Sequence, residues 1–318
     1  MRMYRVLTLW SLAIVGVAGP AVGATDAFLE QTFDLGAEQS KAVQYFMMES
    51  KLIAYALDGT RTDMDVFRLR LKCVPARLSG KAADEYTCAE FTVQIADASE
   101  VAVPALHNWT YPFRQTPSGI DDKGQVFGID HARFAALVDA DGKAIPPDKT
   151  YHVYNAFIDF HAFCNAFARP VSGGRGIQDL KHIGDKIVHA AAFSEPPVNL
   201  GDSIAEGSTF KNGKVTLAFK GLSCVDDAAC ALVAYDSGQS SFQMIVNPMP
   251  SMEVRTVGSS HYLGDLHIDL ATRWVRKATM AEFVVFETTL PMAPHKINGV
   301  VERQIVIRNV SEKEFGSH

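Results

Sequence analysis

Hydrophobic and polar positions alternate in many short segments of this chain, which is the pattern of half-buried β-strands. Residues 65–73 (DVFRLRLKC) place apolar side chains on one face and basic side chains on the other. The segment EYTCAEFTVQIA follows after a polar stretch that contains a glycine, so we expect these two strands to form a hairpin. A second hairpin is predicted at 137–145, where an Asp-Gly pair supplies the turn.

Strand candidates follow one another almost without interruption in the C-terminal part of the chain. They are KVTLAFKGL, CALVAYD, SFQMIV, MEVRTV, HYLGDLHIDL, RWVRKATM, EFVVFETT and VVERQIVIRNV. Short connections imply antiparallel neighbours, and a long antiparallel meander must close into a barrel or curl over another element. The sequence therefore predicts a mainly β fold (β-rich α+β) with two antiparallel curved sheets or half-barrels joined by a helical bridge.

The predicted bridge, at about 149–190, begins after two prolines. A helix that stops at Pro170 would carry an aromatic stripe, and a buried strand is the alternative. For 176–190 a helix and a strand also both remain open. The segment FSEPPVNLGDS at 193–203 reads as a linker. We therefore expect an N-terminal domain over 25–196 and a C-terminal domain over 197–318.

The first 24 residues have the charged, apolar and small-residue regions of a secretory signal peptide, with Arg2 and Arg5 ahead of the run VLTLWSLAIVGVAG. This run ends at a Gly-Pro pair and is short for a membrane span. We expect cleavage near residue 24, and a soluble mature protein in the periplasm or outside the cell without a transmembrane segment.

The net charge of the chain limits the classes of partner that we expect it to bind. The chain has 30 basic and 36 acidic residues, and the expected signal peptide contains two of the basic ones and none of the acidic ones. The mature chain would carry a net charge of −8, which argues against nucleic acid as a partner and against membrane binding by bulk charge.

Five cysteines lie in the mature chain. In an oxidising compartment we expect Cys73 to pair with Cys88 and Cys224 with Cys230, because each pair closes a short loop between strand-like segments. Cys164 would remain as an unpaired thiol. The spacing of the cysteines does not match a zinc site.

The segment HYLGDLHIDL at 261–270 presents His261, Asp265, His267 and Asp269 on one face of a strand. Side chains two residues apart on a strand are about 7 Å apart. They form a wet polar face, a metal site or an acid–base pair, and the ordinary solvent face is our preferred interpretation.

A second polar cluster depends on the bridge. If 176–190 were a helix, His182, Asp185 and His189 would share one face and offer chemically acceptable zinc ligands. The histidines would lie about 10 Å apart along the helix axis, too far for one ion without other ligands. A polar helix face is therefore preferred. Cys164 with a neighbouring histidine is a third candidate, but its aromatic surroundings suggest a buried apolar role.

Signatures of common enzymes are missing, namely the nucleophile elbow, the zinc-protease helix, the phosphate-binding loop and the dinucleotide fingerprint. We therefore expect no cofactor, no assigned metal site and no catalytic residue, and we lean against an enzyme.

Three C-terminal segments carry a resemblance: FSEPPVNLGDS, GSTFKNGKVTLAFKGL and GDLHIDLATRWVRKATM. Over 193–310 the chain resembles uncharacterised exported bacterial proteins with a Pro-Val-x-x-Gly-Asp entry and an Asp-x-x-Thr-Gly hairpin turn. Here the turn is Asp269 to Thr272, and Arg273 stands where glycine is expected. The resemblance implies a curved half-barrel like those of periplasmic lipoprotein carriers, and it brings no functional residues.

Together these observations predict an exported, non-catalytic protein that binds an apolar ligand, such as a lipid, or an envelope partner. The alternatives are a structural or interaction protein of the cell envelope and a metal-dependent hydrolase that uses the histidines above.

Overall fold

The structure is a computed structural model that describes residues 30–115, 125–191, 193–194, 205, 207–249, 252–291 and 296–317. The longer strands are β1 (Gln44–Tyr55), β2 (Arg61–Val74), β3 (Glu85–Gln94), β9 (Thr216–Val225), β10 (Ala228–Asp236), β11 (Ser240–Met249), β12 (Met252–Asp269), β13 (Val275–Thr289) and β14 (Ile297–Val310). The shorter strands are β4 (Val101–Ala102), β5 (Trp109–Pro112), β6 (Lys186–Val188), β7 (Phe193–Ser194) and β8 (Thr209–Lys211). The helices are α2 (Ala76–Ser79), α3 (Pro147–His161) and α4 (Glu312–Gly316), with a π-helical turn at Ala162–Ala166 and short 3-10 turns at Pro104–Leu106, His131–Phe134 and Ile177–Asp179.

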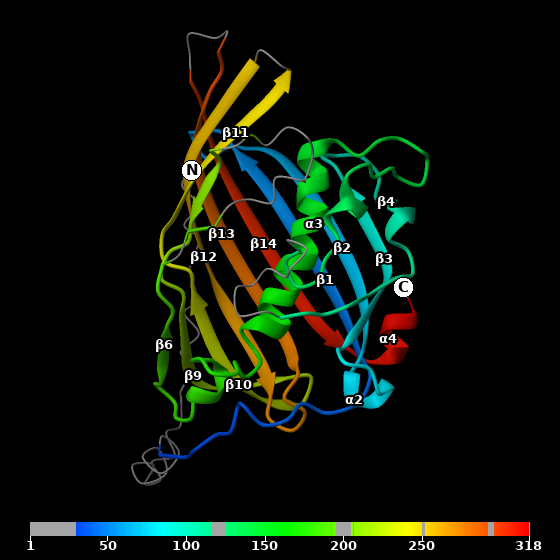
Figure 1. Cartoon of the computed structure of the whole chain (residues 1–318), viewed down its shortest axis with the longest axis vertical. Helices are drawn as coiled ribbons and strands as arrows, with labels where there is room; N and C mark the ends of the chain where they lie inside the picture. Colours follow the sequence, from blue (N-terminus) through cyan, green and yellow to red (C-terminus); the bar gives the residue numbers. More distant parts are fainter. Residues whose placement is uncertain are drawn as a thin grey trace, which may run out of the picture.

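The fourteen strands of the described residues all belong to one open antiparallel sheet, which confirms the mainly β fold class. Its main order is β4-β3-β2-β1-β14-β13-β12-β10-β9-β6 (Figure 1). The first and last long strands pair along eleven residues, from Tyr45 opposite Val310 to Tyr55 opposite Val300. This pairing joins the N-terminal and C-terminal halves of the chain edge to edge.

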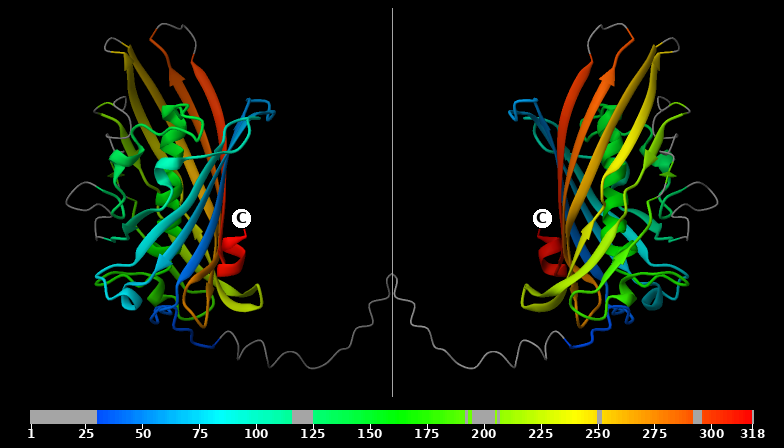
Figure 2. Two further views of the ribbon diagram at one scale, coloured as in Figure 1. Left: turned by 90° about the vertical axis from the view of Figure 1, so that its right-hand side faces the viewer. Right: turned by 90° about the vertical axis from the view of Figure 1, so that its left-hand side faces the viewer.

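The sheet is strongly curved and has two chemically different faces. The inner, concave face holds α3, whereas α4 lies on the outer face (Figure 2). Strand β2 shows the alternation that the sequence predicts, because Phe67, Leu69 and Leu71 are buried on the inner face and the basic residues between them point outward. The hairpin of β2 and β3 is confirmed as well.

In two places, two segments that the sequence predicts as separate strands form one long strand. The segments MEVRTV and HYLGDLHIDL form β12, and RWVRKATM with EFVVFETT forms β13. Pairing of β12 with β13 runs without a shift from Arg255 to His267, so the polar residues between the apolar segments do not interrupt the sheet. Long strands of this kind give the sheet its height.

Helix α3 fills the concave side of the sheet and confirms the predicted aromatic helix. The rings of Phe157 and Phe91 stack at 5.7 Å, and those of Phe160 and Phe46 meet edge to face at 5.0 Å. Its first residue is Pro147, a favoured position for proline, and Pro146 occupies the cap position. The π-helical turn then carries the chain to the end of this buried element.

The remainder of the expected bridge is not helical. After the short turn at Ile177–Asp179 the chain bends, Gly184 adopts a φ of 103°, and residues 186–188 form β6. The helix considered for 176–190 is therefore wrong, because a glycine in this conformation ends any helical path. The strand alternative holds only for β6.

The hairpin turn between β12 and β13 keeps its geometry without the expected glycine. Arg273 adopts a φ of 63°, in the left-handed region that favours glycine. The Asp269 carboxylate accepts hydrogen bonds from the backbone N–H groups of Ala271 and Thr272 at 2.8 and 2.9 Å. The aspartate therefore holds the turn closed.

Several sequence predictions concern residues outside the described part of the chain. The expected signal peptide at 1–24 lies there, as do residues 195–203 of the expected linker at 193–203. Among the helices of the described residues, none is long and apolar enough to cross a membrane.

Candidate functional site

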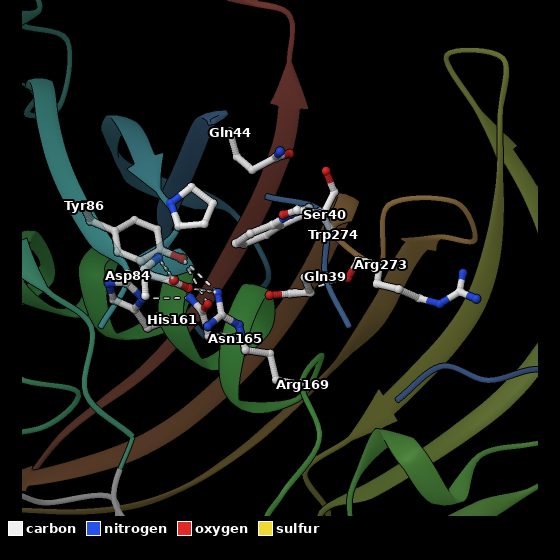
Figure 3. Close-up of polar contacts among 12 residues, drawn as sticks. Gln39, Ser40, Gln44, Asp84, Tyr86, His161, Asn165, Arg169, Arg273 and Trp274 are labelled. Carbon is white, nitrogen blue, oxygen red and sulfur yellow. Dashed lines mark hydrogen bonds and ion pairs between the residues drawn. The ribbon is translucent and has the colours of Figure 1, made fainter. Parts of the chain in front are cut away.

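A buried polar network lies where the end of α3 meets β3 and β5 (Figure 3). The Tyr86 hydroxyl donates to the side-chain oxygen of Asn165 at 3.0 Å, and the Asn165 amide donates to Nδ1 of His161 at 2.9 Å. The proton of the imidazole therefore sits on Nε2, which donates to the Tyr111 hydroxyl at 2.9 Å. These four side chains are almost completely buried.

An ion pair closes this network toward the end of the sheet. The Arg169 guanidinium lies 2.7 Å from the Asp84 carboxylate and 5.1 Å from the centre of the Trp274 ring. Burial lowers the pKa of His161 well below its ordinary value, so the ring is neutral. The hydrogen bonds among Tyr86, Asn165, His161 and Tyr111 satisfy one another, and aromatic rings pack around them, an arrangement that fixes the orientation of α3.

The buried cysteines around this network do not have activated thiols. Burial raises the pKa of Cys73 and Cys88 to about 12, and it raises the pKa of Cys164 as well. A thiol with a raised pKa is a poor nucleophile at neutral pH. Cys164 packs in the core, in line with its expected apolar role.

A second inner cluster joins the other face of α3 to the sheet. Arg303 on β14 forms ion pairs with Asp159 of α3 and, at 2.7 Å, with Glu282 of β13. Burial raises the pKa of Asp159 to about 6, against the opposing effect of Arg303. Nearer the start of the helix, Lys149 pairs with the buried Asp65 of β2. These contacts attach the helix to the sheet.

The four polar residues of the 261–270 strand share one parity of β12 but have separate partners. His261 hydrogen-bonds Asp236 at 2.8 Å, and His267 hydrogen-bonds Ser223 at 2.8 Å. Asp269 belongs to the turn described above, and Asp265 lines a depression on the outer face. The structure does not bring the four together around one point.

In the bend that replaces the considered helix, Nδ1 of His182 lies 3.6 Å from the Asp185 carboxylate, and His189 follows on the far side of β6. The Asp185 carboxylate accepts hydrogen bonds from the backbone N–H groups of Lys181 and His182 at 2.8 and 2.7 Å, so it serves as a turn cap. The backbone N–H of His189 bonds to the carbonyl of Val215, the residue before β9. Among the described residues, no three His, Cys, Asp or Glu side chains are placed to hold a metal ion.

The two expected disulfides are not present in the structure, where all five cysteines carry free thiols. In the register of β2 and β3, Cys73 lies opposite Tyr86, and Cys88 lies opposite Leu71. Cys224 lies opposite Ala229 and is exposed, whereas the neighbouring Cys230 is buried. Short sequence separation did not place either pair directly opposite each other across the strands.

Sequence reasoning missed an apolar surface on the outer face. Six of the ten large apolar side chains that are exposed in the described part of the chain lie on β12, β13 and β14, and five of these point outward. We call these five the outer patch: Val257, Leu263, Phe283, Val285 and Val306. Phe283 is 48% exposed and Val285 is 54% exposed. A signal existed in the run FVVF at 283–286, since four consecutive apolar residues in a strand put apolar side chains on both faces.

Two depressions adjoin the outer patch. One, of about 480 Å³, lies over β6, β9, β10 and β12 and is lined by Lys186, Lys214 and Lys220 among others. The second, of about 340 Å³, lies over β12, β13 and β14. Both include Leu263, which belongs to the outer patch, and Gly264.

Comparison with known proteins does not assign the chain to a family. No family model matches the chain, and no curated protein matches it. Among solved structures, OmpTdeltaL8, a loop L8 deletion mutant of OmpT, an outer membrane protein of Vibrio cholerae, aligns at 7% identity over 85% of this chain and 99% of that chain, with a TM-score of 0.16. A TM-score of this size supports no argument about fold or function.

Proposed function

We propose that this is an exported, non-catalytic protein that binds lipid through the outer face of β12, β13 and β14. Export rests on the signal-like residues 1–24, and the periplasm or the medium is the expected location. The observation that carries the binding proposal is the exposure of Phe283 and Val285 at adjacent outward positions of a strand in the interior of the sheet.

The inner face is a poor place for an apolar ligand. The aromatic side chains of α3 already occupy it, and Phe157 and Phe160 are fully buried there. Displacing the helix would expose these rings and break the ion pair of Asp159 with Arg303, at a cost of several kcal/mol. The outer patch needs no such rearrangement.

Exposed apolar side chains gathered on one face of a soluble protein mark sites of interaction. Isolated exposed apolar residues occur on most proteins, but here they are concentrated. Phe283 lies opposite His261 and Val285 lies opposite Ser259, and Leu263 lies two residues from His261 on the same face. Phe283 and Val285 are therefore successive outward positions of β13, and Leu263 lies opposite Ala281, the next outward position of that strand.

The proposal predicts a specific loss of lipid binding. Wild-type protein is mixed with vesicles of equal parts phosphatidylcholine and phosphatidylglycerol, and flotation separates bound from free protein. The double variant Phe283→Gln and Val285→Gln should bind at least about tenfold more weakly, because two partly buried apolar contacts are lost. The control carries Leu78→Gln and Val138→Gln, which remove two exposed apolar side chains elsewhere.

Equal binding by wild type and the outer-patch variant would overturn the proposal. Absence of vesicle binding by the folded wild type would overturn it as well, and would favour an envelope protein as the occupant of the outer patch. Circular dichroism on both variants checks that the fold is retained.

A further inference from the structure

Three lysines surround the larger depression on the outer face. Lys186 comes from β6, Lys220 from β9, and Lys214 precedes β9. All three side chains are exposed. Among the described residues, the ion pairs that lysines make involve other lysines, so these three amines have no acidic partner.

The strand register explains why a depression forms here. Six successive outward positions across neighbouring strands are Lys186, Ala218, Ala234, Asp265, Thr279 and Val306. The two alanines form a low floor between longer side chains on either side. Lys214, just before β9, and Lys220 within it line the same depression as Ala218, on either side of it along the chain.

The basic depression opens toward the apolar surface. It shares Leu263, Gly264 and Asp265 with the smaller depression, which continues to Val306 of the outer patch. A basic region and an apolar region therefore adjoin on one face.

The charge balance of the depression favours an anion. Of the two acidic side chains that line it, Asp236 accepts a hydrogen bond from the backbone N–H of Gly238 at 2.7 Å and pairs with His261. Asp265 is then the one carboxylate that faces three amines. Ammonium groups on flexible stems act as point charges and donors for phosphate oxygens.

We propose that this basic depression binds the phosphate group of an amphiphile whose apolar part lies on the outer patch. This inference rests on the proposed function and deepens it, because it names the headgroup chemistry. The sequence-wide negative charge does not oppose it, since the attraction is local and screened beyond about 8–10 Å.

The test uses the full-length mature protein and dioctanoyl phosphatidic acid as a water-soluble probe, with binding measured by calorimetry. The variant Lys186→Gln, Lys214→Gln and Lys220→Gln should bind the probe at least about tenfold more weakly, given the typical contribution of each lysine near an anionic surface. A control variant carries Lys41→Gln, Lys143→Gln and Lys313→Gln, which remove the same charge at exposed sites elsewhere and should bind like wild type.

Four outcomes separate this inference from the proposed function. Loss of binding in the first lysine variant alone supports the inference. Equal losses in both lysine variants assign the effect to bulk charge and overturn it. Binding of inorganic phosphate as tight as that of the probe assigns the depression to a free anion and overturns the amphiphile. If the first lysine variant binds normally while the outer-patch variant fails in the flotation assay, the inference falls and the proposed function stands.

Discussion

The outer face of the sheet differs between its two halves, although both halves belong to one sheet. On β1, β2 and β3 this face carries cross-strand ion pairs, with Arg68 bound to Glu49 at 2.9 Å and to Glu100, and Arg70 bound to Glu90 at 3.0 Å. On β12, β13 and β14 it carries the outer patch. The fold therefore does not require apolar side chains on this face, and the proposed lipid binding rests on their presence in one half.

Helix α4 sharpens the same contrast. Its Phe315 is buried against the outer face of the first half, with its ring 5.1 Å from that of Tyr45 and 4.7 Å from the guanidinium of Arg70. An apolar side chain on the outer face is thus covered where the chain itself supplies the cover. In the described residues of the second half, Phe283 and Val285 have no such cover.

The largest expected effect compares one residue type in two places. Phe157→Ala on the inner face should destabilise the protein by about 3–5 kcal/mol, because a fully buried ring leaves a cavity. Phe283→Ala on the outer patch should cost less than about 1 kcal/mol. Urea unfolding of both variants measures the difference. Similar losses would show that the Phe283 ring supports the fold, and would remove the main argument for a binding role.

A smaller effect concerns pH and the inner charge cluster. Because burial raises the pKa of Asp159 to about 6 from its ordinary 3.8, the folded state holds this proton more tightly than the unfolded chain. Stability from this group is therefore lost as pH rises from about 4 to about 6. Relative to Asp159→Asn, the wild type should lose about 1–3 kcal/mol across this window in urea unfolding at a series of pH values.

Glu49 on the outer face supplies the control of opposite sign. Partial burial opposes the shift, but hydrogen bonds from Lys51 and Arg68 lower the pKa of Glu49 below 4.5. Its contribution is therefore present above pH 4.5 and is lost as pH falls. Relative to Glu49→Gln, the wild type should gain stability as pH rises. If the stability difference between wild type and variant changed with pH in the same direction for Asp159 and for Glu49, the opposite pKa shifts of the two carboxylates would be contradicted.

The smallest expected effect tests the ion pairs of the first half. Arg68→Ala should cost less than about 1 kcal/mol, because its side chain is partly exposed and the pairs it makes are screened by salt. Thermal unfolding at low and at high salt measures the cost, which should shrink as salt is added. A salt-independent loss above about 2 kcal/mol would mean that this face is held together by more than surface charge.

Local pattern was enough to predict much of the fold. The alternation in residues 65–73 and the aromatic stripe of α3 depend on neighbours in sequence, and both are present. Pairing of β1 with β14 joins residues more than 240 positions apart, so no local pattern contains it. The helix considered for residues 176–190 was wrong. The polar residues there have helical spacing, but Gly184 adopts a backbone conformation that excludes a helix.

The candidate site was harder to predict than the fold. Alternation shows that two faces of a strand differ, but it cannot show which face another element covers. The run at 283–286 is apolar on both faces, and only the position of α3 in space identifies Phe283 and Val285 as the uncovered pair. The network of Tyr86 with His161 was likewise invisible, because its members come from elements far apart in sequence.

The measurement that tests the central claim most directly uses tryptophan as a local reporter on each half of the outer face. Phe283→Trp places the reporter on the outer patch, and Lys51→Trp places it on the ion-paired half. Vesicles of equal parts phosphatidylcholine and phosphatidylglycerol, with brominated acyl chains, quench an indole that enters them. We predict a blue shift and strong quenching for the F283W protein and little change for the K51W protein. Equal quenching of both reporters, or none at position 283 in protein that floats with the vesicles, would contradict the account.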